Sequence, residues 1–257
     1  MRLPPLVRLV IRNFVSNLDP LSIIFRFGQP AFTIVVLGTM FSSLVTSSAV
    51  ASGSYTAFLV PGMIAFQMVT GAVVSGNLFW LDRRWAMVEQ IFSGPFLKAE
   101  YLAGLLITTL LFALVGVGLM LLVALPFVGL PALSLLGIVV VLLSIGFGSV
   151  FFAGVLIAIG SRLRSANAYF TIQSFLQLFL VFLSTVYYPV SPSTPRALAI
   201  ILDGNPLTYA ANATRDAFRG TLGPSDMVSL LVLGILAAIA FALAIQGFRT
   251  LDPGPIQ

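Results

Sequence analysis

The sequence predicts an all-α protein that crosses a membrane several times. Of its 257 residues, 59% are hydrophobic and only 8% are Asp, Glu, Lys or Arg. Two long segments, 27–81 and 101–161, contain none of these four residue types, whereas segment 82–100 between them contains six charged residues. A charge at the centre of a bilayer costs roughly 2.5–3.5 kcal/mol on insertion scales, so uncharged runs of this length are typical of spanning helices.

The uncharged runs fit six spans. A spanning helix needs about 20 apolar residues, so the first run must turn back at the polar stretch 46–54 and the second near 126–131. Two further uncharged runs, 165–195 and 227–248, hold one span each. Within a single transmembrane domain over residues 1–257, the predicted spans are 27–45, 56–80, 102–125, 132–160, 169–188 and 227–248.

The distribution of Lys and Arg predicts the orientation. Ten of these thirteen residues fall on the side that carries both termini and segment 82–100, and three fall on the other side, namely Arg196, Arg215 and Arg219. Basic residues are enriched on the cytoplasmic side, so we expect both termini in the cytoplasm. The composition favours the plasma membrane of a prokaryote. The net charge of +5 suits anionic membrane lipid, and no basic and aromatic pattern favours nucleic acid.

Residues 1–20 predict an amphipathic helix in the inner membrane interface. Arg8 and Arg12 interrupt the hydrophobic run that a signal peptide needs. The apolar residues Leu3, Leu6, Val7, Val10 and Phe14 lie on a different helical face from these arginines. The alternative is a simple positively charged flank to the first span.

The composition excludes most catalytic chemistry. The chain has no Cys and no His, which removes disulfides, thiolates, the usual metal ligands and Ser-His-Asp triads. Lys98 is its single lysine, and no P-loop motif is present. We therefore expect no enzyme activity and no cofactor in this chain, and any energy source must be a partner or a gradient.

Segment 81–95 predicts a short amphipathic helix on the cytoplasmic side. Leu81, Trp85, Val88 and Phe92 share one stripe at helical spacing, which leaves the other faces to Asp82, Arg83, Glu89 and Gln90, and Gly94-Pro95 ends the helix. Such a helix either docks into a groove on a soluble partner or rests on lipid headgroups.

The segment between the fifth and sixth spans predicts a helical hairpin. Ser193-Thr194-Pro195 is typical of a helix start, and a second helix is expected from Leu207 to a stop at Gly220. The first helix is short and apolar, so we expect the pair to re-enter the outer leaflet, where backbone must pack on protein or line a wet cavity. An ordinary interfacial loop is the alternative.

Polar residues inside the spans are the remaining candidates for a pathway. They are Gln67, Thr70 and Asn77 in the second span, and Thr171, Gln173, Ser174 and Gln177 in the fifth. Buried amides in lipid either join helices or subunits or line a pathway. The glycines at 146, 148, 154 and 160 favour close helix packing.

Several motifs, in order along the chain, resemble the membrane subunits of ABC-2 type exporters. They are Tyr55-x-x-Phe58-x-x-Pro61-Gly62, Asp82-Arg83-Arg84 with Glu89 and Pro95, Tyr188-Pro189-Val190-Ser191 with Pro195, and Asn205-Pro206-Leu207-Thr208-Tyr209 with Arg215. The later motifs are similar to the drug and lipo-oligosaccharide branch, and the resemblance covers nearly the whole chain. Trp85 departs from the small residue or glycine of many relatives.

The resemblance implies a half-transporter that pairs with a second copy as a homodimer and rests on two copies of a separate ATP-binding subunit. Those subunits would bind ATP and Mg and drive export. Segment 82–92 would be the coupling helix, with Asp82, Arg83, Trp85, Glu89 and Phe92 at the ATPase contact. A substrate pathway is expected at Gln67, Thr70, Gln173 and Gln177, and an outer lid at Pro195, Asn205, Pro206, Tyr209 and Arg215.

The implied cavity is apolar with a few amides, which favours an amphipathic cargo such as a lipid, glycolipid or drug. Secondary transporters and channels commonly carry intramembrane charges or repeated halves, and neither is evident here. A gradient-driven transporter, a channel or a noncatalytic scaffold subunit nevertheless remains the alternative class. An importer subunit fits less well, because segment 82–95 lacks the expected alanine and glycine pattern.

Overall fold

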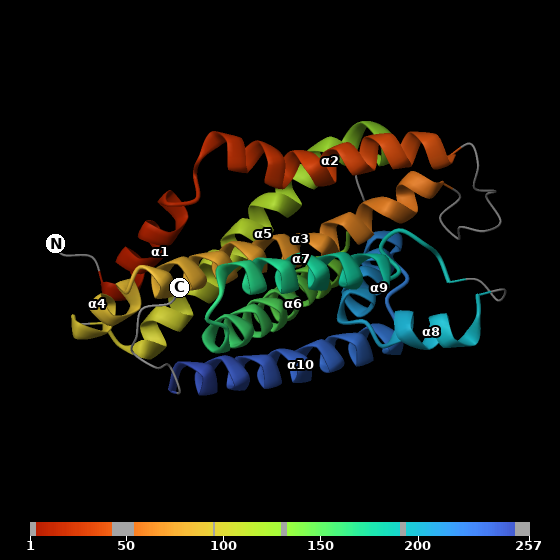
Figure 1. The fold of residues 1–257 in the computed structure, drawn as a ribbon. Coiled ribbons are helices and arrows are strands. Elements are labelled where there is room, and N and C mark those ends of the chain that lie inside the picture. Colours follow the sequence, from red (N-terminus) through yellow and green to blue (C-terminus); the bar gives the residue numbers. More distant parts are fainter. Residues whose placement is uncertain (1–3, 43–53, 95, 130–132, 191–193, 250–257) are drawn as a thin grey trace.

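The computed structural model describes residues 4–42, 54–94, 96–129, 133–190 and 194–249 (Figure 1). Within these residues the chain forms ten α-helices and no β-strand, which confirms the all-α prediction for this part. The helices are α1 (Pro5–Val15), α2 (Pro20–Ser42), α3 (Tyr55–Arg84), α4 (Met87–Ser93), α5 (Lys98–Val128), α6 (Leu135–Arg162), α7 (Ala166–Phe182), α8 (Arg196–Asp203), α9 (Pro206–Arg219) and α10 (Pro224–Arg249).

Some predicted features fall wholly or partly outside the described residues. They are the turns at 46–54 and 126–131, Leu3, Pro95, and the start of the outer hairpin at Ser193.

The long helices form a bundle around α3. Among the described residues, five helices are long and apolar enough to cross a membrane: α2, α3, α5, α6 and α10. Almost all of α3 is buried, and it packs against α2, α5, α6 and α9, while α6 also runs along α10. A helix that is apolar all round belongs in the interior of such a bundle. The other four expose apolar faces, as contact with lipid requires.

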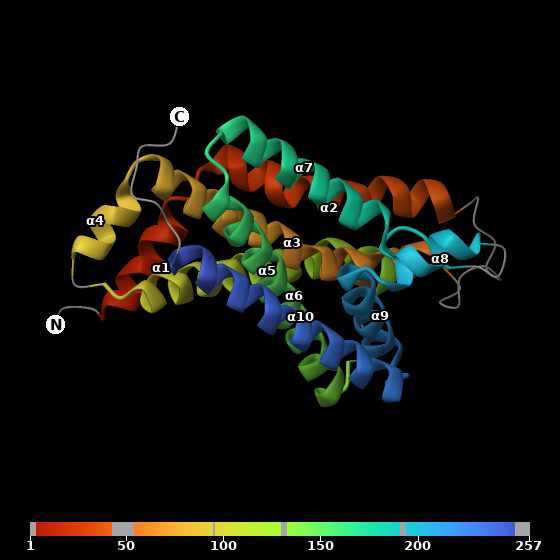
Figure 2. The ribbon, with the colours of Figure 1, turned by 60° about the horizontal axis from the view of Figure 1, so that its bottom comes forward.

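The short helices gather at the two ends of this bundle. In both views α1 and α4 lie at one end, and α8 and α9 lie at the opposite end (Figures 1 and 2). Segments 82–94 and 196–219 are therefore on opposite sides of the apolar layer, as their charges predict.

The largest differences between predicted and observed helix ends are at the start of α2 and the end of α7. Helix α2 begins at Pro20 rather than at residue 27, because the Asp19 carboxylate accepts a hydrogen bond from the Ser22 amide at 2.9 Å and proline suits the first turn. Helix α7 ends at Phe182 rather than at residue 188. Its 17 residues are fewer than the roughly 20 of an ordinary span. The Asn205 side chain closes it by donating to the carbonyls of Leu180 and Leu183 at 2.8 and 2.7 Å.

Small residues bring the helices into backbone contact. An added Cβ at Gly154 would lie 2.8 Å from the backbone of Ala240 in α10, and one at Gly160 would meet the Phe79 ring at 3.2 Å. A Cβ at Gly148 would meet the Met68 side chain, whereas one at Gly146 has nothing within 4 Å. Close packing thus explains three of these four glycines.

Among the described glycines, the closest approach to the backbone of another helix joins α3 to α5 at Gly71. An added Cβ there would lie 2.4 Å from the carbonyl oxygen of Thr109, which is backbone and cannot swing away. Beside it, the Ser75 hydroxyl donates to the Leu105 carbonyl at 2.7 Å and receives a hydrogen bond from the Thr109 hydroxyl at 2.7 Å. These two contacts fix the position of α5 against the central helix.

We expect Gly71→Ala to lower the free energy of unfolding by about 1–3 kcal/mol, since α5 must move away from α3. The better helix propensity of alanine returns at most about 1 kcal/mol. Gly118→Ala is the matched control, because a Cβ at this exposed position of α5 meets nothing within 4 Å. Thermal unfolding of both variants in detergent measures the difference, and equal midpoints would contradict the packing role of Gly71.

Candidate functional site

The connection between α3 and α5 is a bent elbow, residues 81–94, and not one amphipathic helix. Helix α3 continues to Arg84, and α4 begins only at Met87, because Ala86 adopts a left-handed conformation with φ of 53°. The predicted single stripe is therefore wrong. Trp85 is 67% exposed whereas Val88 is 3% exposed. The helix ends at Gly94, as predicted.

Asp82 and Arg83 are buried at the end of α3. The Asp82 carboxylate pairs with the Arg12 guanidinium at 2.5 Å and accepts the Tyr101 hydroxyl at 2.8 Å. The Arg83 guanidinium donates to the carbonyls of Gly160 and Leu163 at 2.6 and 2.7 Å, at the end of α6, where helix carbonyls lack partners and a cation is favourable. These two side chains, predicted at the ATPase contact, thus tie the elbow to α1, α5 and α6.

Helix α4 presents one side to the bundle. Val88 and Ile91 are buried, and the half-buried Phe92 packs edge-on against Tyr101 and Phe248, with ring centroids 5.8 and 6.4 Å apart. Glu89 is partly buried, and one of its carboxylate oxygens has no hydrogen-bond partner among the described residues.

Three apolar side chains of the elbow are exposed, and we call them the elbow surface: Leu81, Trp85 and Met87. The Arg84 guanidinium lies over the Trp85 ring, 5.8 Å from its centroid, and adds a positive charge beside this surface. The apolar surface available for a partner therefore lies at the bend and not along α4.

Helix α1 has two apolar sides. One side packs on α5, where Leu9 and Asn13 are buried beside Gly104. The other is an exposed row of Val7, Ile11 and Val15 at helical spacing, and the exposed Leu18 follows just after the helix. This second row, rather than the predicted face with Leu6 and Phe14, suits contact with lipid.

Helices α8 and α9 form the predicted hairpin, and α9 has the predicted start and stop. Asn205 caps α9 by accepting the Leu207 amide at 2.9 Å, Pro206 occupies its first turn, and Gly220 ends it with φ of 70°. Tyr209 is half-buried against the core, and Pro195 precedes α8. The start signal at Asn205-Pro206 and the stop signal at Gly220 were thus sufficient to locate α9.

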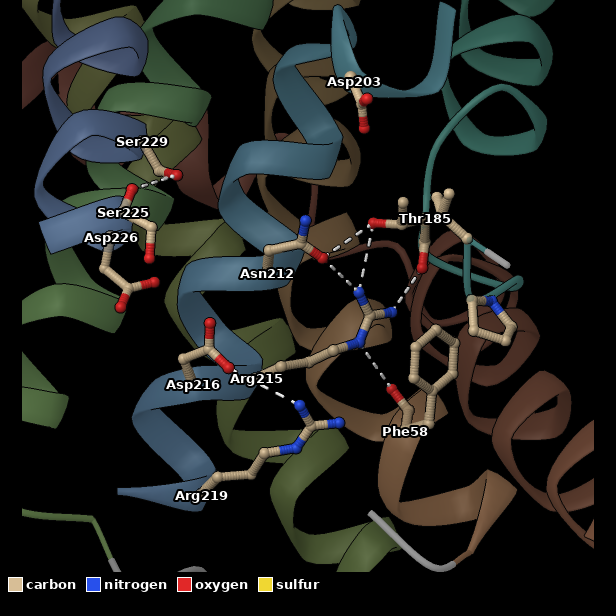
Figure 3. Close-up of a pocket in the computed structure, with 12 residues that line it drawn as sticks. Phe58, Thr185, Asp203, Asn212, Arg215, Asp216, Arg219, Ser225, Asp226 and Ser229 are labelled. Carbon is tan, nitrogen blue, oxygen red and sulfur yellow. Dashed lines mark hydrogen bonds and ion pairs between the residues drawn. The ribbon is translucent and has the colours of Figure 1, made fainter. Parts of the chain in front are cut away.

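Arg215 fastens α9 to the bundle (Figure 3). The residue is 4% exposed, and its guanidinium lies 3.8 Å from the Phe58 ring centroid. It donates to the Phe58 carbonyl at 3.1 Å, the Thr185 carbonyl at 2.5 Å and hydroxyl at 3.2 Å, the Val186 carbonyl at 3.2 Å and the Asn212 amide oxygen at 2.9 Å. These bonds use all five of its N–H groups, so Arg215 is a structural clamp with none left for a ligand.

A cavity of about 450 Å³ lies beside this clamp (Figure 3). It is lined by Asp203, Asp216 and Asp226, with Arg219 and Ser225 among the other polar residues. Burial, and then the Arg219 charge, lower the pKa of Arg215 to about 9, so it stays charged at neutral pH. Burial and the neighbouring Asp226 raise the pKa of Asp216, which lies 3.7 Å from the Arg219 guanidinium. The described residues contain no group of acidic side chains that could hold a metal ion.

The predicted pathway residues lie on two different sides of α3. Gln67 is fully buried against Gly116 of α5, and both polar atoms of its amide lack partners among the described residues. Gly76, nine residues further along α3, lies about 180° around the helix and faces α7, because its Cβ would touch the Tyr169 hydroxyl. Gln67 therefore does not share a face with Gln173 within one chain. Thr70 is 8% exposed, Gln173 is 7% exposed and Gln177 is half-buried.

The contact between α3 and α7, here called the polar seam, was only partly visible in the sequence. The rings of Trp80 and Tyr169 stack with centroids 4.9 Å apart and planes 6° apart. Each has a polar atom without a partner among the described residues, as do Asn77 and Gln173. In the sequence, the amides of Asn77 and Gln173 stand out as polar residues within spans. Trp80 and Tyr169 do not, because aromatic residues are common in the core of an uncharged helix.

These apolar spanning helices, with an elbow at one end and a clamped hairpin at the other, define a multi-pass membrane protein. The family model described as ABC-2 type transporter matches residues 6–218. The chain therefore belongs to the ABC-2 type transporter family, which confirms the predicted family. This membrane domain is a permease for membrane transport rather than a catalytic domain, and the family implies an ATP-binding partner in general. The comparison with curated proteins found no match.

Proposed function

We propose that this permease is the membrane half of an ATP-driven exporter of the drug and lipo-oligosaccharide branch. Two identical copies would stand side by side on two ATP-binding subunits, which supply ATP and Mg. The elbow surface of Leu81, Trp85 and Met87 carries the proposal, because it is apolar, exposed and located where a cytoplasmic partner can reach it. We place it in a prokaryotic plasma membrane with both termini in the cytoplasm.

The contacts of the elbow suit it to transmit movement. Asp82 and Arg83 bind it to α1, α5 and α6, and Val88 and Ile91 seat α4 on the bundle. A partner that pulls on Trp85 therefore moves the ends of the two long helices α3 and α5. Trp85 and Met87 would contact the ATP-binding subunit directly, with Glu89 and Phe92 beside them. Asp82 and Arg83 would transmit the movement of the elbow to the helices that they bind.

We further propose six spans, with α7 as the fifth. At 1.5 Å per residue its 17 residues cover about 26 Å, close to the hydrocarbon thickness of about 30 Å, and residues 183–190 extend it. Helix α8 exposes Leu198, Ile200 and Ile201, which fits a hairpin that re-enters the outer leaflet.

The polar seam favours an amphipathic cargo. Its unpartnered atoms lie inside the bundle of membrane-crossing helices, away from water, where an unsatisfied polar group is costly. A lipid, glycolipid or drug with a polar end can satisfy them, as can the second copy. The seam lacks Asp, Glu, Lys and Arg, which is unfavourable for coupling to an ion gradient.

The test is Trp85→Asp in the purified permease reconstituted with its ATP-binding subunit. We expect at least about a tenfold loss of ATP-dependent transport, since an aromatic anchor at an interface is commonly worth 2 kcal/mol or more. The variant should still insert, because Trp85 touches no buried core. Trp85→Phe is the conservative control and should retain most transport. Full transport by Trp85→Asp would refute the elbow surface, and failure of any ATPase to associate would favour a gradient-driven transporter or a scaffold.

A further inference from the structure

A long apolar groove runs between α5 and α10, at the end of the bundle that carries the elbow. Its volume is about 550 Å³. It is lined by Lys98, Ala99, Leu102, Ala103, Leu106, Ile107, Leu110, Val150, Phe241, Ile245 and Phe248. From Lys98 to Leu110 the groove follows α5 for about 18 Å at 1.5 Å per residue, which matches the roughly 15 Å of hydrocarbon in one leaflet.

One cationic side chain, Lys98, lies at one end of this apolar groove. Lys98 is the only lysine of the chain and the only charged residue that lines the groove. Its side chain is exposed, and the ammonium lies 5.5 Å from the Phe92 ring. The nearest acidic residue along α5, Glu100, uses its carboxylate to accept the Leu97 amide at 3.0 Å. The ammonium is therefore available to an anion from outside.

We propose that the groove binds an anionic phospholipid, with an acyl chain along α5 and α10 and the phosphate at Lys98. The groove opens between helices that cross the membrane, so lipid is the molecule it meets. The ammonium of Lys98 at one end suits the phosphate of a phospholipid, and the apolar lining along the rest of the groove suits its acyl chain. In the proposed orientation the lipid comes from the cytoplasmic leaflet, and this assignment of the leaflet rests on the proposed function.

The site borders the elbow. Lys98 contacts Phe92 of α4, and the groove residue Phe248 packs against Phe79, Phe92 and Tyr101, with ring centroids 5.2–6.4 Å apart. A bound phosphate draws Lys98 away from Phe92, while the acyl chain holds Phe248 in place. Lipid in the groove thus sets how firmly α4 is seated, and the lipid composition regulates coupling.

Native mass spectrometry of the purified permease tests binding without any ATPase. Phosphatidylglycerol and phosphatidylcholine of identical acyl chains are titrated separately. We expect the wild type to prefer the anionic lipid by about fivefold, the effect of one basic residue at a membrane surface. Lys98→Gln should lose this preference and still bind both lipids, Lys98→Arg should keep it, and Ala103→Trp should fill the groove and weaken both. Arg196→Gln, at the opposite end of the bundle, is the control for unspecific charge effects and should match the wild type.

Equal binding of the two lipids by the wild type would overturn the proposal, as would an unchanged preference in Lys98→Gln. Neither result depends on transport, so failure here is distinguishable from failure of the proposed exporter. In the reconstituted complex, Lys98→Gln should also make ATP hydrolysis insensitive to the fraction of phosphatidylglycerol. A retained lipid dependence in this variant would overturn the regulatory part.

Discussion

Replacing Arg215 with leucine is expected to lower the free energy of unfolding by about 3–5 kcal/mol, because it leaves several buried acceptors unpaired at roughly 1–3 kcal/mol each. Each hydrogen bond to a charged group contributes about 1.5–3 kcal/mol, and Arg215 makes five bonds in a site that water hardly reaches. Leucine removes the donor to three buried carbonyls together, those of Phe58, Thr185 and Val186. The α8–α9 hairpin should detach first, because this clamp joins α9 both to the start of α3 and to the segment after α7.

Thermal unfolding and limited proteolysis at 194–223 measure this effect. Arg219→Leu is the matched control, one turn away on α9, since its ion pair with Asp216 is 3.7 Å long and about a third exposed. Such a pair contributes at most about 1 kcal/mol. Arg215→Lys keeps the charge but reaches fewer acceptors, so its loss should be intermediate. Equal stability of the two leucine variants would show that Arg215 is not the clamp.

The sequence was sufficient for features that depend on local chemistry. Long uncharged runs predicted the spanning helices, and the Asn205-Pro206 start and Gly220 stop predicted α9. Each signal acts within one or two turns of chain, so it does not require knowledge of the packing. The end of α7 was less accessible, because a contact from Asn205, more than twenty residues away, closes this helix.

The roles of charged residues at the elbow could not be predicted in the same way. Helical spacing treats Asp82 and Arg83 as solvent-facing, yet both are buried because their partners come from α1, α5 and α6. The bend at Ala86 is also unpredictable, since alanine strongly favours a continuous helix. Tertiary contacts override that preference here and turn Trp85 outward.

The central helix connects both ends of the molecule. Phe58 near the start of α3 contacts Arg215, and Asp82 near its end contacts Arg12 and Tyr101. Between these points α3 is buried and tightly packed on α5 at Gly71. A rigid helix fixed at both ends transmits a displacement rather than absorbing it. The Arg215 clamp and the Arg12–Asp82 network are therefore the places where coupling between the elbow and the α8–α9 hairpin is most easily broken.

Asp82→Ala is accordingly the second variant with a large expected effect. It leaves the fully buried Tyr101 hydroxyl without its acceptor and the Arg12 guanidinium without its counter-ion. We expect a loss of about 3–5 kcal/mol in the free energy of unfolding, at the lower end because Arg12 is 28% exposed and water can solvate it. Helix α1 should loosen from α5, and transport should fall more than ATP hydrolysis, because the elbow still binds its partner but no longer moves α5 with it.

A double-mutant cycle separates this network from a general loss of stability. Arg12→Leu removes the cation, and the double variant Arg12→Leu with Asp82→Ala removes both charges. If the two residues form one network, the double variant will be more stable than the sum of the single losses predicts, by about 0.5–3 kcal/mol. The unfolding free energies of the four proteins, measured in the same lipid mixture, give this coupling directly. Strictly additive losses would mean that Arg12 and Asp82 act independently, and α1 would then have no link to the elbow through them.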